Sequence, residues 1–389
     1  MEPQSGGIRK TYKTYKTYKY RLTPTPAQAQ ALATVLSHCR MLYNVALEQR
    51  KTWWDRGQGI GATYYQQKAE LPDVKAACPE VAEVNAQVLQ DVILRVERTY
   101  QDFFRRIKDG ETAGSPRYQG WGRYTSFTYP QYGGGVALDG SVLSLSKIGR
   151  IRIRLHRPLE GAPKTVTISR EADGWYACIS CAEVPIAPLP STGRETGIDV
   201  GLKAFLVTAD GEVIENPRHY RKAEKHLATA QRRVARRKKG SNRRKKAVKL
   251  LARKHQTVKR QRSDFHHKTA LMLVQQFDTI YLEDLQVRNM VRNRRLAKSI
   301  SDAGGGQFRT ILTFKAAWAG KRVVAVPAQY TTQDCSGCGE RVPKSLSVRT
   351  HVCRSCGLVM DRDENAALNI LRAGRARQAL TWPDGASVA

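Results

Sequence analysis

The chain has 389 residues, and its 66 lysines and arginines outnumber its 34 aspartates and glutamates, which gives a formal net charge of +32. Its apolar content of 41% is enough to bury sizeable cores and excludes wholesale disorder. No apolar run approaches the roughly 20 residues that cross a bilayer, so we expect no membrane partner. A charge of this size favours a polyanionic partner, most economically nucleic acid, over a protein that is merely basic and soluble.

The first half of the chain predicts a β-rich domain with helices inserted into it. Residues 11–19 read TYKTYKTYK and predict a strand whose Tyr and Lys side chains either serve base stacking and phosphate pairing or are simply solvated. Helical periodicity follows at about 27–51, 63–68 and 81–108, and the apolar stripe of the third segment contains Val88, Val92, Val96, Tyr100 and Phe104.

Short alternating strands then continue to about residue 184, separated by Asp-Gly and Gly-Pro turn signals. We expect a β-barrel or sandwich built from residues 1–26 and 113–190, with a helical domain at 27–112. The segment PIAPLPSTG (185–193) has the composition of a linker.

The second half starts with GIDVGLKAFLVTADGEVIEN, in which two apolar strands flank a turn and predict a hairpin. Residues 221–262 then hold nineteen Lys and Arg residues and one acid, Glu224, a net charge of +18. Apolar residues at helical spacing, including Leu227, Val248 and Val258, predict two basic helices with a break at Gly240-Ser241.

A charge run is usually a solvated face, but this density favours phosphate contacts within 221–277. The residues that we expect to bind nucleic acid are Arg232, Arg233, Arg236, Arg237, Lys238, Lys239, Arg243, Arg244, Lys245 and Lys246. The rest of the chain predicts a domain over 191–330, a small ribbon at 331–359, a last helix at 360–375 and a tail at 376–389.

Eight cysteines are present, and the last four form the pattern CSGC, fourteen residues, CRSC. Cys335, Cys338, Cys353 and Cys356 therefore predict a four-thiolate zinc site, and two disulfides are the disfavoured alternative in a chain with no secretion signal. Gly339 and Gly357 follow the two pairs and ease the tight turns that such knuckles need.

The other four cysteines do not predict a metal site. Cys178 and Cys181 lie on a predicted strand, where residues three apart point to opposite faces and cannot share one metal. Cys39 and Cys78 are expected to be small core residues.

Four acidic residues lie within or at the ends of predicted strands and helices, at three places in the chain. Asp199 lies inside an apolar strand, Glu283 ends the strand FDTIYLEDL, and Asp361 and Asp363 open the last helix. Burying a carboxylate is costly without a partner, and a divalent cation is one such partner. Three converging carboxylates predict a two-metal Mg²⁺ site for phosphodiester chemistry, although each acid taken singly also suits a turn or a cap.

Four motifs in chain order, GIDVGLK, YLEDL, CSGC…CRSC and DRDENAALNIL, resemble the TnpB (OrfB) proteins of insertion sequences, small relatives of type V CRISPR effectors. YRLTPTPAQ, GSPRY, RRKKGS and SISDAG also fit. The resemblance implies an N-terminal β-barrel (wedge) with an inserted helical recognition domain. A RuvC-like nuclease of RNase H (α/β) fold would follow, with a zinc ribbon inserted before its last acid.

The resemblance also implies an RNA-guided DNA endonuclease in the prokaryotic cytoplasm, associated with the nucleoid through DNA. Its guide RNA would come from the transposon end, and its double-stranded DNA target would be chosen by a short adjacent motif plus base pairing. Asp199, Glu283 and Asp363 would be the Mg²⁺-binding catalytic acids. A capping argument agrees, because Asp361 with Glu364 three residues later predicts that Asp361 caps the last helix and leaves Asp363 free to project.

One position departs from the family pattern: Gly305 stands where many members have Trp, and we expect a more flexible loop near the active site there, with lower activity. Tyr64, Gln67 and Lys68, on a short helix, are candidates for reading the adjacent motif, unless they form a solvated helix face.

Three other functions compete with the guided nuclease. A nuclease-inactive RNA-guided DNA-binding regulator would lack one of the acids, and all three are present. A strand-transfer transposase of RNase H fold would need a DNA-binding module such as a helix-turn-helix, and the sequence shows no convincing one. A non-catalytic zinc-ribbon RNA-binding protein would give the carboxylate of Asp199 no purpose inside a strand.

Overall fold

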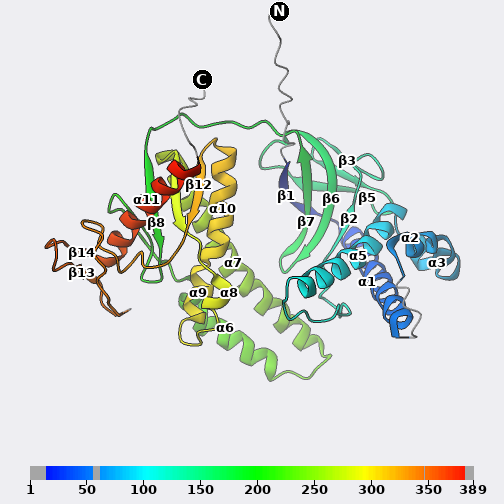
Figure 1. Ribbon diagram of the computed structural model, residues 1–389. Helices are drawn as coiled ribbons and strands as arrows, with labels where there is room; N and C mark the ends of the chain where they lie inside the picture. Colours follow the sequence, from blue (N-terminus) through cyan, green and yellow to red (C-terminus); the bar gives the residue numbers. More distant parts are fainter. Residues whose placement is uncertain (1–14, 56–61, 346, 382–389) are drawn as a thin grey trace, which may run out of the picture. The chain divides into compact units, whose positions relative to one another are not determined.

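Two compact units, Met1–Pro185 and Ile186–Ala389, make up the computed structural model in Figure 1, and each is described by itself. The structure describes residues 15–55, 62–345 and 347–381. Residues 11–14 of the Tyr/Lys repeat and residues 382–389 of the predicted tail therefore lie outside the described residues. Within the described ranges, no helix combines the length and the apolar character that a membrane span needs.

A seven-stranded antiparallel sheet in the order β2-β6-β7-β1-β5-β4-β3 forms the core of the first unit. Its strands are β1 (Tyr15–Thr23), β2 (Ser126–Tyr129), β3 (Val136–Asp139), β4 (Val142–Leu145), β5 (Gly149–Arg154), β6 (Ala162–Glu171) and β7 (Gly174–Ala182). The prediction that the chain's first strand joins this sheet is confirmed, since β1 pairs with both β5 and β7.

The side chains of β1 alternate between the core and the surface, as a half-buried strand requires. Tyr18 and Tyr20 are almost fully buried, and the Tyr18 hydroxyl donates a hydrogen bond of 2.9 Å to Glu160. Of the described tyrosines of the repeat at 11–19, Tyr18 therefore serves the core and cannot stack on bases, whereas Tyr15 is 52% exposed. Cys178 and Cys181 lie on β7 with Cys181 facing the core and Cys178 half-buried, as predicted.

Five helices accompany this sheet in the first unit: α1 (Pro26–Asp55), α2 (Tyr64–Ala69), α3 (Leu71–Ala77), α4 (Pro79–Ala82) and α5 (Ala86–Lys108). The predicted helix over 81–108 begins later than expected. Asn85 caps α5, because its side-chain oxygen accepts a hydrogen bond of 3.0 Å from the Gln87 amide. The apolar stripe is buried at Val88, Val92 and Val96 but reaches the surface at Phe104.

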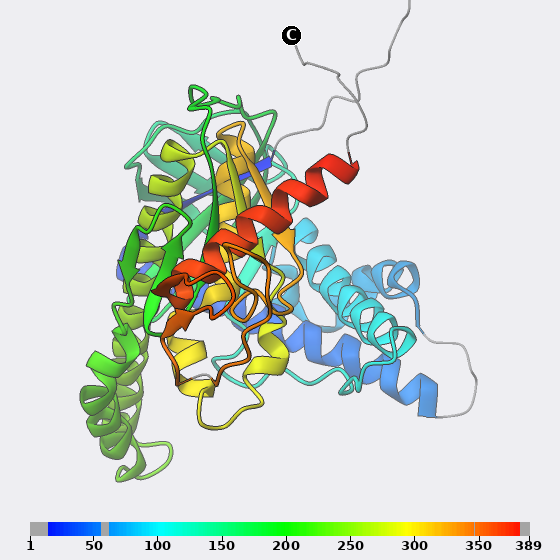
Figure 2. The same cartoon turned by 60° about the vertical axis from the view of Figure 1, so that its left-hand side comes forward.

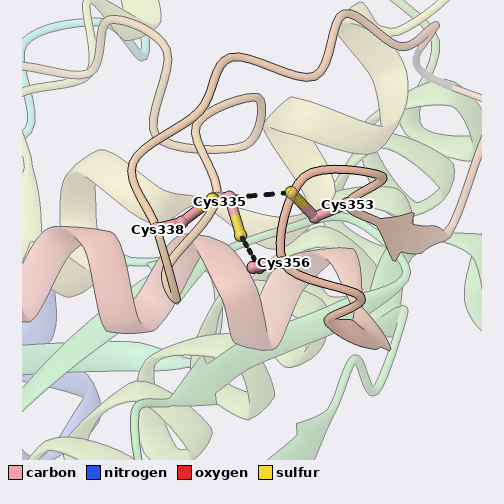
Figure 3. Close-up of side chains that lie close together, drawn as sticks. All are labelled: Cys335, Cys338, Cys353 and Cys356. Carbon is pink, nitrogen blue, oxygen red and sulfur yellow. Dashed lines mark hydrogen bonds between the residues drawn. The ribbon is translucent and has the colours of Figure 1, made fainter.

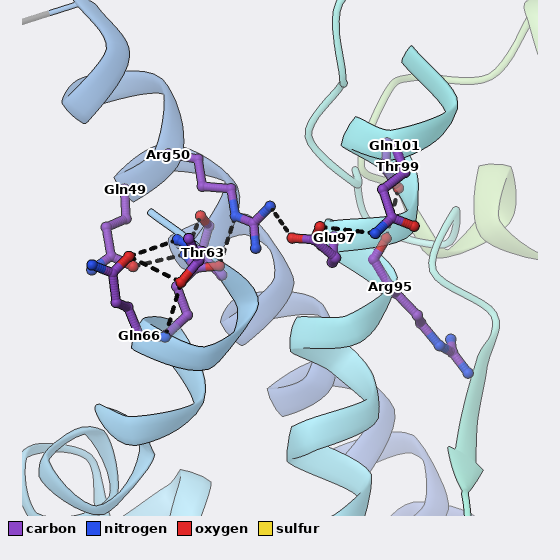
Figure 4. A network of polar contacts seen from close by, with 10 residues as sticks. Gln49, Arg50, Thr63, Gln66, Arg95, Glu97, Thr99 and Gln101 are labelled. Carbon is purple, nitrogen blue, oxygen red and sulfur yellow. Dashed lines mark hydrogen bonds and ion pairs between the residues drawn. The ribbon is translucent and has the colours of Figure 1, made fainter. Parts of the chain in front are cut away.

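A buried arginine joins three of these helices (Figure 4). Arg50 on α1 donates from Nε to Gln67 on α2 at 2.8 Å and from Nη1 to Glu97 on α5 at 2.7 Å. The Gln67 amide nitrogen in turn donates to the Ala46 carbonyl and to Gln49, each at 2.8 Å. This network uses side-chain polar groups in place of apolar packing, and Arg50 Nε and Nη1 each have an acceptor, whereas the buried Arg50 Nη2 has no partner among the described residues.

The second unit has a five-stranded mixed sheet in the order β10-β9-β8-β11-β12. Its strands are β8 (Glu195–Val200), β9 (Ala204–Thr208), β10 (Val213–Glu215), β11 (Thr279–Glu283) and β12 (Arg322–Val326). The predicted hairpin is confirmed by the antiparallel pairing of β9 and β10, whereas β11 runs parallel to β8 and β12. The crossover between β8 and β11 brings residues more than 80 positions apart into register.

Helices cover both faces of this sheet. Ile198 and Leu282 face a core that α7 (Asn242–Gln276) and α10 (Gly305–Trp318) complete with residues such as Leu273 and Phe308. On the other face, α11 (Arg362–Thr381), red in Figure 2, lies against β8 and packs on Tyr281. The unit is therefore a three-layer α/β arrangement. The last helix extends to Thr381, so the expectation that it ends at residue 375 is wrong.

The two predicted basic helices are confirmed as α6 (His219–Ala235) and α7, with the Gly240-Ser241 break between them. Leu227 and Val258 are buried in their seam, as expected. Val248 is 46% exposed, and its neighbour Ala247 is buried instead. The expected position of Val248 is wrong because the helical register places the smaller side chain where α6 and α7 approach each other.

Shorter elements complete the second unit. They are α8 (Val287–Met290), α9 (Ala297–Ala303), β13 (Thr350–Val352) and β14 (Val359–Asp361). Gly305 is the first residue of α10 and follows the left-handed N-cap Gly304, whose φ is +67°. The expectation of a loop at Gly305 is therefore wrong. Together with Gly306 it lines an apolar cleft of about 840 Å³ that also reaches Glu283.

Close packing between β8 and α11 requires a glycine in the strand. A methyl group on Gly197 would collide with the Ala367 carbonyl and the Leu371 amide of the helix. We predict that Gly197→Ala lowers the free energy of unfolding by about 1–3 kcal/mol, because the two backbones would have to separate. Gly306→Ala is the control, since its methyl would meet only Val287 at an ordinary 3.7 Å. Thermal unfolding of both variants measures the difference, and equal melting temperatures would contradict the prediction.

Candidate active site and metal centre

Two parallel neighbouring strands bring the first two predicted acids to one edge of the sheet. Ile198 on β8 pairs with Leu282 on β11, so the residues that follow them, Asp199 and Glu283, lie side by side at the carboxyl ends of their strands. Asp363 is the second residue of α11, the helix packed on β8. The structure therefore brings the three acids predicted from the sequence into one region of the second unit.

The carboxylates of this region interact through a poorly solvated environment. Burial, together with the nearby charges of Glu283 and Asp363, raises the pKa of Asp199 from 3.8 to about 8, while Arg362 opposes the shift. Burial also raises the pKa of Glu283, against a hydrogen bond that its carboxylate accepts from the Thr331 hydroxyl. An added positive charge, whether a proton or a cation, would relieve this repulsion.

Two arginines contact the third acid, Asp363. The Asp363 carboxylate accepts hydrogen bonds from Arg362 Nε at 3.0 Å and Nη2 at 2.8 Å, and Arg349 Nη1 lies 3.6 Å from its other oxygen. The expectation that Asp363 projects freely is therefore wrong for this conformation. Asp361 behaves as predicted, because its carboxylate caps α11 by accepting a 2.8 Å hydrogen bond from the Asp363 amide.

The donor chemistry of the three acids suits Mg²⁺, which prefers a few carboxylates together with water and substrate phosphate. Their oxygens are not drawn together to the spacing of a bound ion, however. Within residues 15–55, 62–345 and 347–381, the only group whose ligand atoms all lie within 4.8 Å of one another is a cluster of four cysteines. The carboxylate oxygens of the three acids would have to move closer to one another to bind a single cation.

That cluster consists of Cys335, Cys338, Cys353 and Cys356, and Figure 3 shows their side chains converging. The Sγ atoms of Cys335 and Cys356, and those of Cys338 and Cys353, are 3.6 Å apart. Four thiolates at the tetrahedral Zn–S distance of about 2.3 Å would be separated by about 3.8 Å, so the spacing fits zinc.

The backbone of each pair turns tightly enough to form a metal knuckle. The Gly339 amide donates to the Cys335 carbonyl at 2.8 Å, and the Gly357 amide donates to the Cys353 carbonyl at 3.0 Å. Both glycines are in the left-handed region, with φ of +83° and +75°. The predicted role of Gly339 and Gly357 is confirmed, because side chains other than glycine rarely adopt this conformation.

Two asparagines on α11 bind the first knuckle to the helix that carries Asp363. Asn365 donates to the Asp334 carbonyl at 2.8 Å and accepts from the Ser336 amide at 2.9 Å. Asn369, one turn later, donates to the Thr331 carbonyl at 2.8 Å and to the Asp334 carbonyl at 2.7 Å. We call these contacts the asparagine clasp. Thr331, whose carbonyl accepts one of these hydrogen bonds, also donates a hydrogen bond from its hydroxyl to the Glu283 carboxylate.

Sequence reasoning missed the asparagine clasp and the arginines on Asp363. The available signal was the pair of asparagines four residues apart in an otherwise apolar helix segment, NAALN, which places two amides on one buried face. Arg362 had a signal too, since a cation directly beside a predicted buried acid is its simplest partner.

The predicted nucleic-acid contacts lie on the surface of the basic helices, with two exceptions. Arg237 is half-buried, and Arg244 donates to the carbonyls of Val234 and Arg237 at 2.9 and 3.0 Å, where it closes the end of α6. Arg244 Nη1 is therefore used within the fold, and the phosphate contact of this residue stays a prediction. The exposed remainder comprises Arg232, Arg233, Arg236, Lys238, Lys239, Arg243, Lys245 and Lys246.

Among the candidates for reading an adjacent motif, Gln67 needs correction. It is 2% exposed, and its amide is used inside the first unit by the Arg50 network. Tyr64 and Lys68 are half-buried, and their neighbour Tyr65 is 79% exposed. Helical geometry explains the error, because Gln67 faces α1 while the residues around it do not.

The raised pKa of Asp199 makes stability depend on pH. Between about pH 4 and pH 8 the folded protein keeps a proton on Asp199 that the unfolded chain has released. The free energy of unfolding therefore falls by about 1.4 kcal/mol for each unit by which the pH rises. We predict that Asp199→Asn melts at a higher temperature than the parent in metal-free buffer, by a margin that grows from pH 5 to pH 8. Asp139→Asn is the control because that side chain is 86% exposed. A margin independent of pH would contradict the prediction.

Removing one thiolate should open the cysteine cluster. We predict that Cys335→Ser or Cys353→Ser loses the bound zinc, expected at about one per chain, and lowers the melting temperature. Cys178→Ser, outside the cluster, should keep the metal. Elemental analysis of reduced protein measures zinc content, and an active preparation that contains none would refute the assignment.

Comparison with known proteins gives concordant matches along the chain. Residues 178–294 match the family described as "Probable transposase", and residues 306–370 match a "Cas12f1-like, TNB domain". Residues 14–59 match a family described as "Helix-turn-helix domain". The described part of that segment, residues 15–55, consists of β1 and the single continuous helix α1.

Relatives match over nearly the full chain. A protein of Streptomyces pristinaespiralis named "Putative RNA-guided DNA endonuclease" is 37% identical, covering 93% of this chain and 90% of the relative. An Escherichia coli K12 protein with the same description, InsQ, is 31% identical, covering 92% of each chain. The fold resembles that in the "Cryo-EM structure of the Cas12f1-sgRNA-target DNA complex", with a TM-score of 0.56 at 15% identity, over 89% of this chain and 83% of the other. The chain belongs to the TnpB (OrfB) family.

Proposed function

We propose that this protein is an RNA-guided DNA endonuclease that hydrolyses a phosphodiester bond at Asp199, Glu283 and Asp363. The observation that carries the proposal is that Asp199 and Glu283 lie side by side at the carboxyl ends of paired strands with Asp363 of α11 near enough to raise the pKa of Asp199, in a chain whose net charge is +32. Relatives described as RNA-guided DNA endonucleases support the reaction class. The guide would be RNA from the transposon end, and the target would be double-stranded DNA.

The three acids would hold Mg²⁺. When bound, two such ions would supply an activated water and stabilise the leaving oxygen. Asp199 and Glu283 extend from paired strands, so their backbone positions are fixed before substrate arrives. The Thr331 hydroxyl orients Glu283 through its hydrogen bond. Arg362 and Arg349 neutralise Asp363 in the absence of a cation and would have to release it.

The remaining parts of the chain would divide the work of recognition. We assign residues 1–26 and 113–190 to a wedge domain that closes as a β-barrel, and 27–112 to a recognition domain. We assign residues 191–330 and 360–381 to the RuvC-like nuclease, with the end moved from 375 to the end of α11, and residues 331–359 to the zinc ribbon. A sheet with three antiparallel strands followed by two parallel ones, covered by helices on both faces, supports the RNase H assignment.

The basic helices α6 and α7 would bind nucleic-acid phosphates independently of the base sequence. Arg232, Arg233 and Arg236 line a hollow of about 620 Å³ on this surface together with Arg237. Clustered guanidinium groups are attracted by the negative charge of the nucleic-acid phosphates, which is the same for every base. Base pairing with the guide would then supply the sequence specificity, which explains why so many cations serve one function.

The competing functions fit the geometry less well. A nuclease-inactive regulator has no need of three acids held together at the cost of a strongly raised pKa at Asp199. A strand-transfer transposase needs a module that reads its own DNA ends, and the described residues 15–55 form a strand and one helix, without the turn between two helices that such a module uses.

Two neighbouring acids provide the sharpest test of the site. We predict that Asp363→Ala abolishes DNA cleavage, as Asp199→Ala and Glu283→Ala also do, while guide and target binding persist. Asp361→Ala is the matched control, because its loss removes a helix cap worth about 1 kcal/mol and leaves cutting measurable. Plasmid cleavage in Mg²⁺ and a gel-shift assay read the two properties separately. An inactive Asp361→Ala beside an active Asp363→Ala would show that the wrong carboxylate was assigned.

A further inference from the structure

A small cationic recess lies in the first unit. Its volume is about 340 Å³, and it is formed by α1, the loop before β2 and the β6 residue Arg170. Arg40 and His38 on α1 line it together with Trp121. None of its lining residues in the described structure is acidic, so the recess attracts anionic groups.

Two residues that line this recess, His38 and Arg40, each carry a buried polar atom that has no hydrogen-bond partner among the described residues. His38 Nδ1 and Arg40 Nε are buried, and neither makes a hydrogen bond to any described residue. Arg40 uses one of its terminal nitrogens on the Gln119 carbonyl, at 3.4 Å, and keeps Nε unused. Buried polar groups are nearly always paired in folded proteins, and an unpaired one calls for an explanation such as an external ligand.

An indole ring stands at the edge of the recess. Trp121 is 78% exposed, and the Arg40 guanidinium lies 5.5 Å from its ring centroid. Asn44 on α1 holds the loop that carries the ring, because its side chain donates to the Gln119 carbonyl at 3.1 Å and accepts from the Gln119 amide at 2.8 Å. A large aromatic surface is therefore presented to solvent by an anchored loop, which lowers the entropy lost on binding.

We propose that this recess binds one unpaired nucleotide, with its base stacked on Trp121 and its acceptor atoms and phosphate at His38, Arg40 and Arg170. Stacking on an aromatic ring next to cations is the common mode for single-stranded nucleic acid, and it tolerates any base. The site deepens the proposed function and rests on it, since guide RNA and unwound DNA are both sources of such a nucleotide.

The test measures binding of fluorescein-labelled single-stranded 12-mers, one RNA and one DNA, to the full chain in the cleavage-inactive Asp199→Ala background. Trp121→Ala should weaken binding of at least one probe by about 5- to 100-fold, the range seen when one stacked base loses its platform. Trp121→Phe, which keeps a ring, should retain most of the affinity. Arg170→Gln, at an exposed position, should also weaken binding. Trp54→Ala is the matched control, because Trp54 is 63% exposed in the same unit.

The two probes identify the source of the nucleotide: loss on RNA alone supports a guide nucleotide, and loss on DNA alone supports a target nucleotide. Equal affinities of Trp121→Ala and Trp54→Ala, with unchanged melting temperatures, would overturn the recess while the parent chain still binds nucleic acid. A parent chain that binds neither probe would overturn the proposed function as well, so the two failures are distinguishable.

Discussion

The parallel pairing of β8 with β11 is the constraint on which the rest of the site depends. It places Asp199 beside Glu283 at one sheet edge, although the two residues are far apart in the chain. The helix α11 then packs so closely on β8 that only a glycine fits at position 197, and this contact fixes where Asp363 enters. The position of the three acids thus follows mainly from strand register and one helix–strand contact.

The cysteine cluster is connected to the same arrangement through the asparagine clasp. Asn365 and Asn369 hold the backbone of residues 331–336, which carries Cys335 at one end and Thr331, the hydrogen-bond donor to Glu283, at the other. Zinc bound by the four cysteines would therefore stabilise a segment that contacts a predicted catalytic acid. The segment that carries the first cysteine pair thus also contributes to the geometry of the acidic site.

Much of this arrangement could be predicted from the sequence where the signal is local. The cysteine pairs with their glycines, the hairpin, the break at Gly240-Ser241 and the Asp361 cap all depend on residues within a few positions of one another. The contacts that escaped prediction join distant segments: Asn369 reaches a carbonyl 38 positions away, and Gln67 is buried by an arginine on another helix. Side-chain type alone does not say which face a short helix turns inward, so Gln67 and Val248 were placed wrongly.

Reprogramming of the guide tests the central claim most directly. The RNA that co-purifies with the protein would be sequenced, and its variable 3′ segment replaced by a sequence complementary to a chosen plasmid. The account predicts that the protein then cuts that plasmid in Mg²⁺ at the new site, next to a short constant motif, and that the Asp199→Ala protein binds the plasmid without cutting it. A cut whose position ignores the guide sequence, or cutting that persists without RNA, would contradict the account.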